Sequence, residues 1–149
     1  MVTPQRHYQL IQNLVEKVIA KHEIPPLLFV CQAEEEHGAI IEVANMSEVE
    51  CMALSNDLVQ RPDVSCTILV AEGIASANDG NATPLEERED SYRVVMFNVM
   101  SATKQAILTS RIDTDLEGNR TYTVPEFLWV DQLEGEFGGS LVRQKIVLN

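Results

Sequence analysis

The first 22 residues carry hydrophobic side chains at the spacing of an amphipathic helix. The apolar stripe consists of Tyr8, Ile11, Leu14, Val15, Val18 and Ile19. The opposite, polar face consists of Gln12, Asn13, Glu16 and Lys17. Thr3 is a suitable N-cap and Pro4 a suitable first helical residue, whereas Pro25 disfavours helical geometry at the residue before it. The pattern predicts a helix over residues 4–22 that packs its apolar stripe on the rest of the fold.

A hairpin is expected next. Residues 27–31 are apolar at every position, which is typical of a central strand that is buried on both faces. A charged turn over 33–38 separates them from a second strand-like run at 39–44. Two strands joined by a short polar turn pair in an antiparallel manner.

The second helix is marked at its start by a capping box. In Ser47-Glu48-Val49-Glu50, the hydroxyl of Ser47 and the carboxylate of Glu50 can each bond a backbone amide that the helix leaves free. Apolar residues then share one face up to Pro62, namely Cys51, Leu54 and Leu58. These signals predict a helix over residues 48–60.

The remainder of the chain reads as strands. Apolar runs at 66–71, 92–99 and 106–112 predict three strands, the last two forming a hairpin that turns near 101–104. Polar and apolar side chains alternate from Thr121 to Val124, which is typical of a strand with one buried face, and Pro125 indicates that this strand lies at an edge of the sheet. Residues 141–148 fit either a strand or a short helix. We therefore expect one α+β domain over residues 1–149, a mainly antiparallel sheet of about six strands with two helices packed on it, in the order α-β-β-α-β-β-β-β.

One segment interrupts this compact pattern. Residues 76–90 show no apolar periodicity, and a loop of that length is usually either mobile or functional. A pocket between the sheet and this loop is therefore one way in which the chain could bind a ligand.

Negative charge is concentrated in the middle of the chain. The protein has a net charge of -12, and residues 31–90 hold 14 acidic residues against two arginines. A pI of about 4.5 argues against direct binding of nucleic acid, which requires a basic face. The acidic segment is interpreted either as a solvated surface that keeps the protein soluble or as a docking surface for a basic partner.

The cysteines and the start of the chain bear on the compartment. The three cysteines, Cys31, Cys51 and Cys66, lie in apolar runs and include no C-x-x-C pair, so we expect buried, reduced thiols. The start of the chain has no apolar core of a signal peptide, and no apolar run is long enough to span a bilayer. We expect a cytoplasmic protein that does not enter the membrane.

Two polar clusters contain side chains of the kinds that bind metal ions. Residues 113–119 resemble the first half of an EF-hand loop, but position twelve would be Val124 where that loop needs a glutamate. A hairpin turn with Gly118 at positive φ explains the same residues. His37 follows three glutamates, yet no ligand spacing supports a metal or a base there. We expect no metal and no cofactor, and the sequence assigns no catalytic residue.

The residues that could contact a partner follow from charge and aromatic content. Phe127 and Trp129 stand out in a chain with only 5% aromatic residues, and they are interpreted as core anchors or as interface anchors near a sheet edge. The candidate partner-binding residues are Glu34, Glu35, Glu36, Glu86, Glu87, Glu89, Phe127 and Trp129.

The leading hypothesis is a small acidic protein that works by binding another protein. The partner is expected to be basic, and assembly into a homo-oligomer such as a homodimer is part of the hypothesis. Acidic secretion chaperones and nucleic-acid mimics belong to this class. The alternative is a small-molecule-binding protein or an enzyme with its pocket between the sheet and loop 76–90. The absence of a known catalytic motif favours the binding protein over the enzyme.

Overall fold

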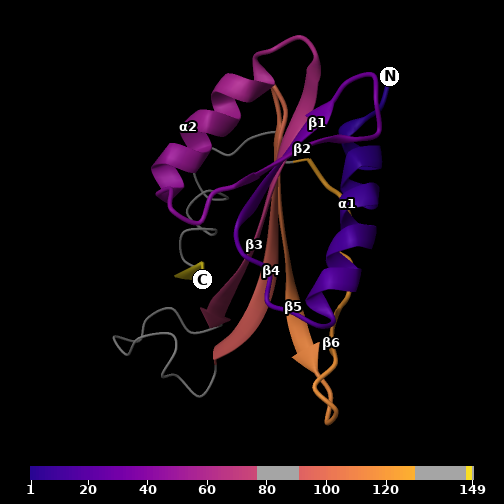
Figure 1. Ribbon diagram of the computed structural model, residues 1–149, viewed down its shortest axis with the longest axis vertical. Coiled ribbons are helices and arrows are strands. Elements are labelled where there is room, and N and C mark those ends of the chain that lie inside the picture. The colour runs from indigo at the N-terminus through magenta and orange to yellow at the C-terminus, as the bar shows by residue number, and fades with distance from the viewer. Residues whose placement is uncertain (77–90, 130–146, 149) are drawn as a thin grey trace.

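The computed structural model describes residues 1–76, 91–129 and 147–148 (Figure 1). Its helices are α1 (Pro4–Ile19) and α2 (Glu48–Val59), and its strands are β1 (Leu27–Gln32), β2 (Gly38–Glu42), β3 (Val64–Ser76), β4 (Ser91–Met100), β5 (Gln105–Thr114), β6 (Arg120–Tyr122) and β7 (Val147–Leu148). The expected order α-β-β-α-β-β-β-β is confirmed from α1 to β6, and β7 adds a further short strand at the end. The α+β class with two helices on an antiparallel sheet is also confirmed.

The sheet runs in the order β2-β1-β3-β4-β5-β6, and every pairing is antiparallel. β2 and β6 are the end strands of this path. The long strand β3 has two neighbours on one edge, because β1 pairs with its residues 64–70 and the short β7 pairs with Gly73 and Ile74. Residues 147–148 of the ambiguous C-terminal segment are therefore a strand.

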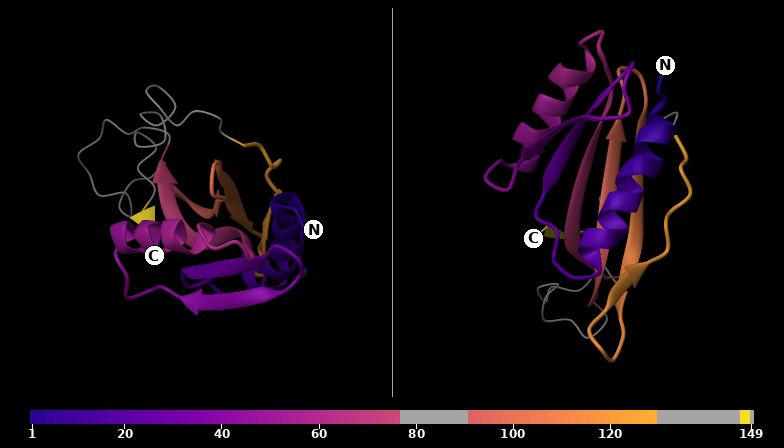
Figure 2. Two further views of the ribbon diagram at one scale, coloured as in Figure 1. Left: turned by 90° about the horizontal axis from the view of Figure 1, so that it is seen from above. Right: turned by 45° about the vertical axis from the view of Figure 1, so that its right-hand side comes forward.

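The two helices cover opposite faces of the sheet (Figures 1 and 2). On one face, α1 packs on side chains that include Phe29, Ile68 and Phe97. On the other, α2 packs on a smaller cluster that includes Leu28 and Leu69. Successive residues of a strand point to opposite faces, so the continuous apolar runs of the sequence supply both cores.

The face assignment within α1 is partly wrong. Ile11, Val15 and Ile19 are buried as expected, but Gln12, predicted on the polar face, is only 3% exposed. Conversely, Leu14 and Val18, predicted in the buried stripe, are 45% and 37% exposed. The helix is rotated relative to the expectation, and the contacts described below explain why.

From α1 to β6, two element ends differ from the expectation by three residues or more, and the other bounds differ by two residues at most. α1 ends at Ile19 instead of residue 22, because Ile24 turns into the core and its amide bonds the carboxylate of Glu72 at 2.6 Å. β3 extends to Ser76 instead of ending at residue 71, and it carries the buried Glu72 within it.

Part of the expected organisation lies outside the described residues. This applies to loop 76–90 beyond Ser76, and so to the pocket expected beside it, to Glu86, Glu87 and Glu89, and to residues 141–146. Within the ranges that the structure describes, neither helix is long and apolar enough to cross a bilayer.

Candidate functional site

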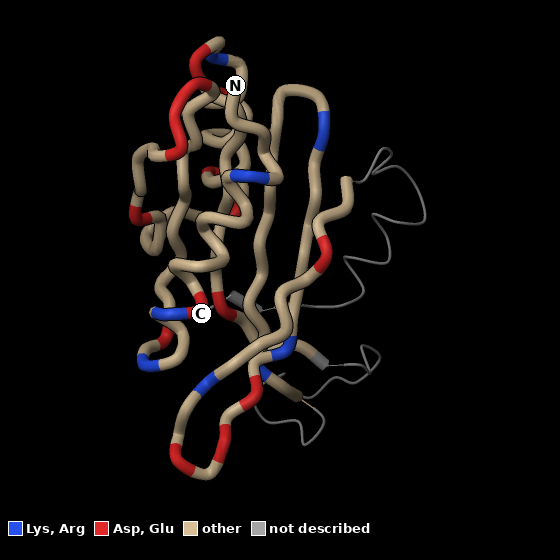
Figure 3. The backbone as a smooth tube through the Cα atoms, turned by 90° about the vertical axis from the view of Figure 1, so that its right-hand side faces the viewer, with Lys and Arg blue, Asp and Glu red and all other residues tan. Residues whose placement is uncertain are grey.

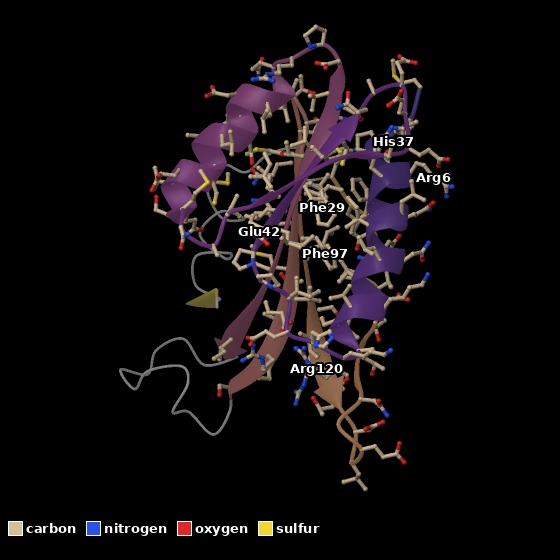
Figure 4. The ribbon with its side chains drawn as sticks, viewed as in Figure 1. Arg6, Phe29, His37, Glu42, Phe97 and Arg120 are labelled. Atoms are coloured by element: carbon tan, nitrogen blue, oxygen red, sulfur yellow. The ribbon has the colours of Figure 1, made fainter. Side chains whose placement is uncertain are left out.

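An apolar groove of about 250 Å³ lies between α1 and the β1–β2 hairpin. α1 forms one wall, and strands β1 and β2 form the floor and the other wall. The residues that line it include Leu10, Leu14, Phe29, Cys31, Gly38 and Ile40. Figure 4 shows Phe29 and Phe97 between the sheet and α1, with Arg6 and His37 near one end of the helix and Arg120 near the other.

The groove exists because α1 is held toward the β6 side of the sheet. The hydroxyl of Tyr8 donates to the backbone oxygen of Pro125 at 2.8 Å, and the hydroxyl of Tyr122 donates to Oε1 of Gln12. Tyr8 and Gln12 are one helical turn apart, so they form a stripe that faces β6. Burial raises the pKa of Tyr8 to about 12 and raises that of Tyr122 as well, so both phenols are protonated donors at neutral pH.

Held in this way, α1 leaves a second stripe uncovered. Leu10, Leu14 and Val18 recur every four residues and so lie above one another on the helix, on the side away from β6. Leu10 and Leu14 line the groove, and the exposed Val18 continues the stripe beyond it. The apolar surface of α1 is therefore wider than the part that the sheet buries.

The facing wall is the end strand β2. Ile40, at its centre, is 55% exposed and lies opposite Phe29 on β1. Within the described residues no strand pairs with the outer edge of β2. Natural edge strands are commonly protected by proline, charge or short length. β6 is three residues long and is followed by Pro125, whereas β2 has five residues and only Glu42 as a charge.

Acidic side chains border one end of the groove. Glu34, Glu35 and Glu36 are all exposed in the β1–β2 turn, where Glu36 pairs with Arg6 of α1 at 2.6 Å and Glu35 with His37 at 2.9 Å. Near the start of α1, Nε2 of His7 lies 2.6 Å from the backbone oxygen of Gln32, the last residue of β1. A carbonyl oxygen can only accept, so His7 donates this bond and fixes the start of α1 against β1.

The acidic residues do not gather on one surface. Those of the β1–β2 turn lie beside the N-terminus, whereas those of the β5–β6 turn lie at the opposite end of the molecule (Figure 3). A third group is exposed on α2, which covers the other face of the sheet: Glu48, Glu50 and Asp57. Among the candidate acidic residues that the structure describes, Glu36 lines the groove, and Glu34 and Glu35 are exposed in the same turn.

A buried charge network holds the other end of α1. Glu72 is fully buried; its Oε2 accepts from the amide of Ile24, and its Oε1 pairs with Arg120 and, at 3.4 Å, with Arg93. Arg120 also donates to the backbone oxygen of His22 at 2.8 Å. The network joins β3, β4 and β6 to the segment after α1. It positions the helix, and every group in it has a partner.

The two aromatic candidates pack within the chain. The ring of Phe127 lies 5.3 Å from that of Tyr8, and the ring of Trp129 lies 4.9 Å from that of Phe127. Both are half-buried against the core, on the β6 side of α1. They help to hold α1 there and are not brought together with Glu34, Glu35 and Glu36; their contact with a partner stays a prediction.

The 113–119 segment is a hairpin turn. Oδ1 of Asp115 accepts from the amides of Glu117 and Asn119, both at 2.9 Å, and Gly118 has φ of 89°. These bonds, above all those from Asn119, lower the pKa of Asp115. Its carboxylate is engaged by the local backbone, as the turn interpretation requires. Among the described residues no group of three or more histidine, cysteine or acidic side chains could hold a metal.

The three cysteines are free and buried, as predicted. Freshly reduced protein is therefore expected to show three reactive thiols in denaturant, and folded protein is expected to react on the order of tenfold or more slowly, because burial disfavours the thiolate. Titration with a chromogenic thiol reagent in both states measures this. Equal rates in the two states would contradict the burial of all three.

Comparison of the chain with protein families, with curated proteins and with solved structures finds no match. The chain is an α+β protein in which one helix, held to one side of an antiparallel sheet, leaves an apolar groove beside an open edge strand.

Sequence reasoning missed the groove and the Glu72 network, although both left a trace. The i, i+4 repeat of Leu10, Leu14 and Val18 makes the apolar stripe of the first helix unusually wide. Glu72 is the only polar residue between Ile68 and Ala75, which signals a buried carboxylate that needs partners.

Proposed function

We propose that the protein binds another protein by taking an extended segment of it into the groove between α1 and β2. The observation that carries this proposal is the exposed apolar surface formed by Leu14 and Ile40 on either side of the groove and continued along α1 by Val18. Contiguous apolar surface of this kind on a protein marks a site of interaction.

The open edge of β2 suggests how the segment is held. An extended peptide beside an end strand gains main-chain hydrogen bonds along the strand, and pockets for alternate side chains provide selectivity. Ile40 lies on the α1 face of β2, so every second residue of the added strand would face Leu14 and Phe29. Apolar residues at alternate positions are the expected signature of the bound segment.

The size and lining of the groove favour a peptide over a small molecule. Pockets for small ligands usually have volumes of about 300–1,000 Å³ and enclose most of the ligand. The groove is smaller, at about 250 Å³, and opens along an exposed strand. The small-molecule alternative, with its pocket beside loop 76–90, remains a second hypothesis that rests on the sequence.

Charge complementarity points to a basic partner. Glu36 lines the groove, Glu34 and Glu35 lie in the same turn, and Glu42 ends β2 at the opposite end of the hairpin. A segment with lysine or arginine beside its apolar residues would be attracted, mainly through faster association. A second copy of the chain would bring a further net charge of -12, which opposes self-association through the same groove. The binding experiment must therefore distinguish peptide binding from homodimerisation through the groove.

Single charges placed in the groove are expected to weaken binding at least tenfold. The probe is a panel of short fluorescent peptides with valine or leucine at alternate positions and lysines at both ends, followed by fluorescence anisotropy. Leu14→Asp and Ile40→Asp bury a carboxylate under the bound peptide, whereas both positions are exposed in the free protein, so folding is little affected. The matched controls, Val49→Asp and Leu116→Asp, lie at exposed apolar positions on α2 and in the β5–β6 turn. Absence of saturable binding by the wild type to any peptide, or equal losses in the controls, would overturn the proposal; a concentration-dependent dimer that the groove variants abolish would replace the peptide by a second copy.

Charge reversal beside the groove is expected to act on the rate of association. Replacing Glu34, Glu35 and Glu36 by lysine should slow association with the lysine-flanked peptides, and more so at low salt, since screening acts beyond about 8 Å at physiological ionic strength. Reversal of Asp57, Asp113 and Glu117, which are exposed elsewhere, should have little effect. Stopped-flow measurement at two salt concentrations checks this. Equal slowing in both variants would show that net charge, and not this turn, attracts the peptide.

A further inference from the structure

Two cysteines face each other across neighbouring strands at the groove. Cys31 of β1 and Cys66 of β3 are register partners in the antiparallel pairing, and both belong to the cluster beneath α1. Register partners point to the same face of a sheet, with Cα atoms about 4.5–5.5 Å apart. A disulfide spans Cα separations of about 4.4–6.8 Å. The Cα separation of register partners therefore falls within the range that a disulfide can span.

The two thiols interact in the reduced protein. A hydrogen bond to the thiol of Cys31, together with burial, raises the pKa of Cys66 well above its ordinary range. Cys66 is fully buried, so it meets no reagent directly. Its chemistry depends on its neighbour.

Cys31 is only 3% exposed, but it is the one of the two cysteines that borders the groove. Its register partner on the other side is Gly38 of β2, which has no side chain to cover the thiol. A Cβ atom on residue 38 would lie 1.9 Å from the backbone oxygen of Val30, so the close approach of the strands requires glycine there. The third cysteine, Cys51, lies in the cluster on the other face of the sheet. A reagent in the groove would therefore reach Cys31 before Cys66, and Cys51 takes no part in the pair.

We propose that Cys31 and Cys66 form a redox-active dithiol that closes reversibly to a cross-strand disulfide when a low-molecular-weight disulfide, such as oxidised glutathione, enters the groove. The thiolate of Cys31 attacks one sulfur of the small disulfide, forming a mixed disulfide and releasing one small thiolate. The thiol of Cys66 then attacks Sγ of Cys31 while its proton passes to the departing small thiolate, which leaves as the second small thiol. The two protons from the cysteines end on the two small thiols, and the two electrons lost by the protein reduce the small disulfide. This chemistry does not depend on peptide binding.

The test follows the folded, fully reduced protein in oxidised glutathione without oxygen. Samples are alkylated at intervals, and the products are mapped by mass spectrometry. The expected product is a monomer that has lost two hydrogen atoms, contains a peptide linking Cys31 to Cys66, and returns to the dithiol with dithiothreitol. Cys51→Ser is expected to behave as the wild type.

The single variants distinguish the order of attack. Cys66→Ser is expected to accumulate the mixed disulfide at Cys31, because the resolving thiol is gone. Cys31→Ser is expected to form the mixed disulfide at Cys66 on the order of tenfold more slowly, because Cys66 is buried away from the groove. Circular dichroism shows whether each variant is folded. If either variant is not folded, the presence or absence of the peptide that links Cys31 to Cys66 in the wild type tests the proposal. No linked peptide in the wild type, a link through Cys51, or only disulfide-bonded dimers would overturn the proposal.

Discussion

Replacing Ile11 with aspartate is expected to lower the free energy of unfolding by about 3 kcal/mol or more. Ile11 is 8% exposed and lies in the cluster between α1 and the sheet. A carboxylate there would be removed from water into an apolar cluster, which is among the few changes that cost a domain this much. Urea denaturation followed by circular dichroism measures the change at constant m-value.

The control for this variant is Asn13→Asp. Asn13 is exposed on the same helix, so the same new charge is expected to cost less than about 1 kcal/mol. Gln12→Asp tests whether residue 12 is buried, as in the structure, or exposed, as the sequence pattern predicts. Gln12 was predicted on the polar face but is buried, its Oε1 accepts from Tyr122, and its Nε2 has no partner within the described residues. We expect it to cost more than Asn13→Asp; equal costs for these two would show that α1 is not rotated as described.

Removal of the buried carboxylate by Glu72→Ala is expected to cost about 3 kcal/mol. Taking one partner from a buried ion pair leaves the other charge uncompensated, which typically costs about 3–5 kcal/mol. The side chain of Arg93 is 41% exposed and can be hydrated, so we expect a loss at the lower end of this range. The side chain of Arg120, which is 15% exposed, and the amide of Ile24 are less readily hydrated when the carboxylate is removed. The exposed strand residue Glu42 provides the control, and Glu42→Ala is expected to cost less than about 1 kcal/mol.

A conservative variant identifies which part of the network matters. Glu72→Gln keeps an oxygen that can accept from the amide of Ile24 but removes the charge that faces Arg120 and Arg93. Its loss of stability is expected to fall between those of the wild type and Glu72→Ala. A Glu72→Ala protein as stable as the Glu42→Ala control would show that the network does not hold α1.

Local sequence signals determined the element order. The capping box of Ser47 and Glu50 and the N-cap of Thr3 form as predicted, because each is satisfied by backbone amides within one helical turn. The antiparallel pairs 27–31 with 39–44 and 92–99 with 106–112 follow from apolar runs joined by short turns. The apolar positions of the three cysteines likewise predicted their burial.

What the tertiary structure decided is where these elements sit against one another. Periodicity places Leu14 and Val18 on the apolar side of a helix, but only the bonds from Tyr8 and Gln12 to the β6 side rotate that helix and open the groove. A glutamate normally interrupts a buried strand, and β3 continues through Glu72 only because Arg93 and Arg120, distant in sequence, lie beside it. The pairing of Cys31 with Cys66 depends on the register of two strands, which neither strand encodes alone. Contacts between residues far apart in the chain fix all three, and no pattern within a single segment contains them.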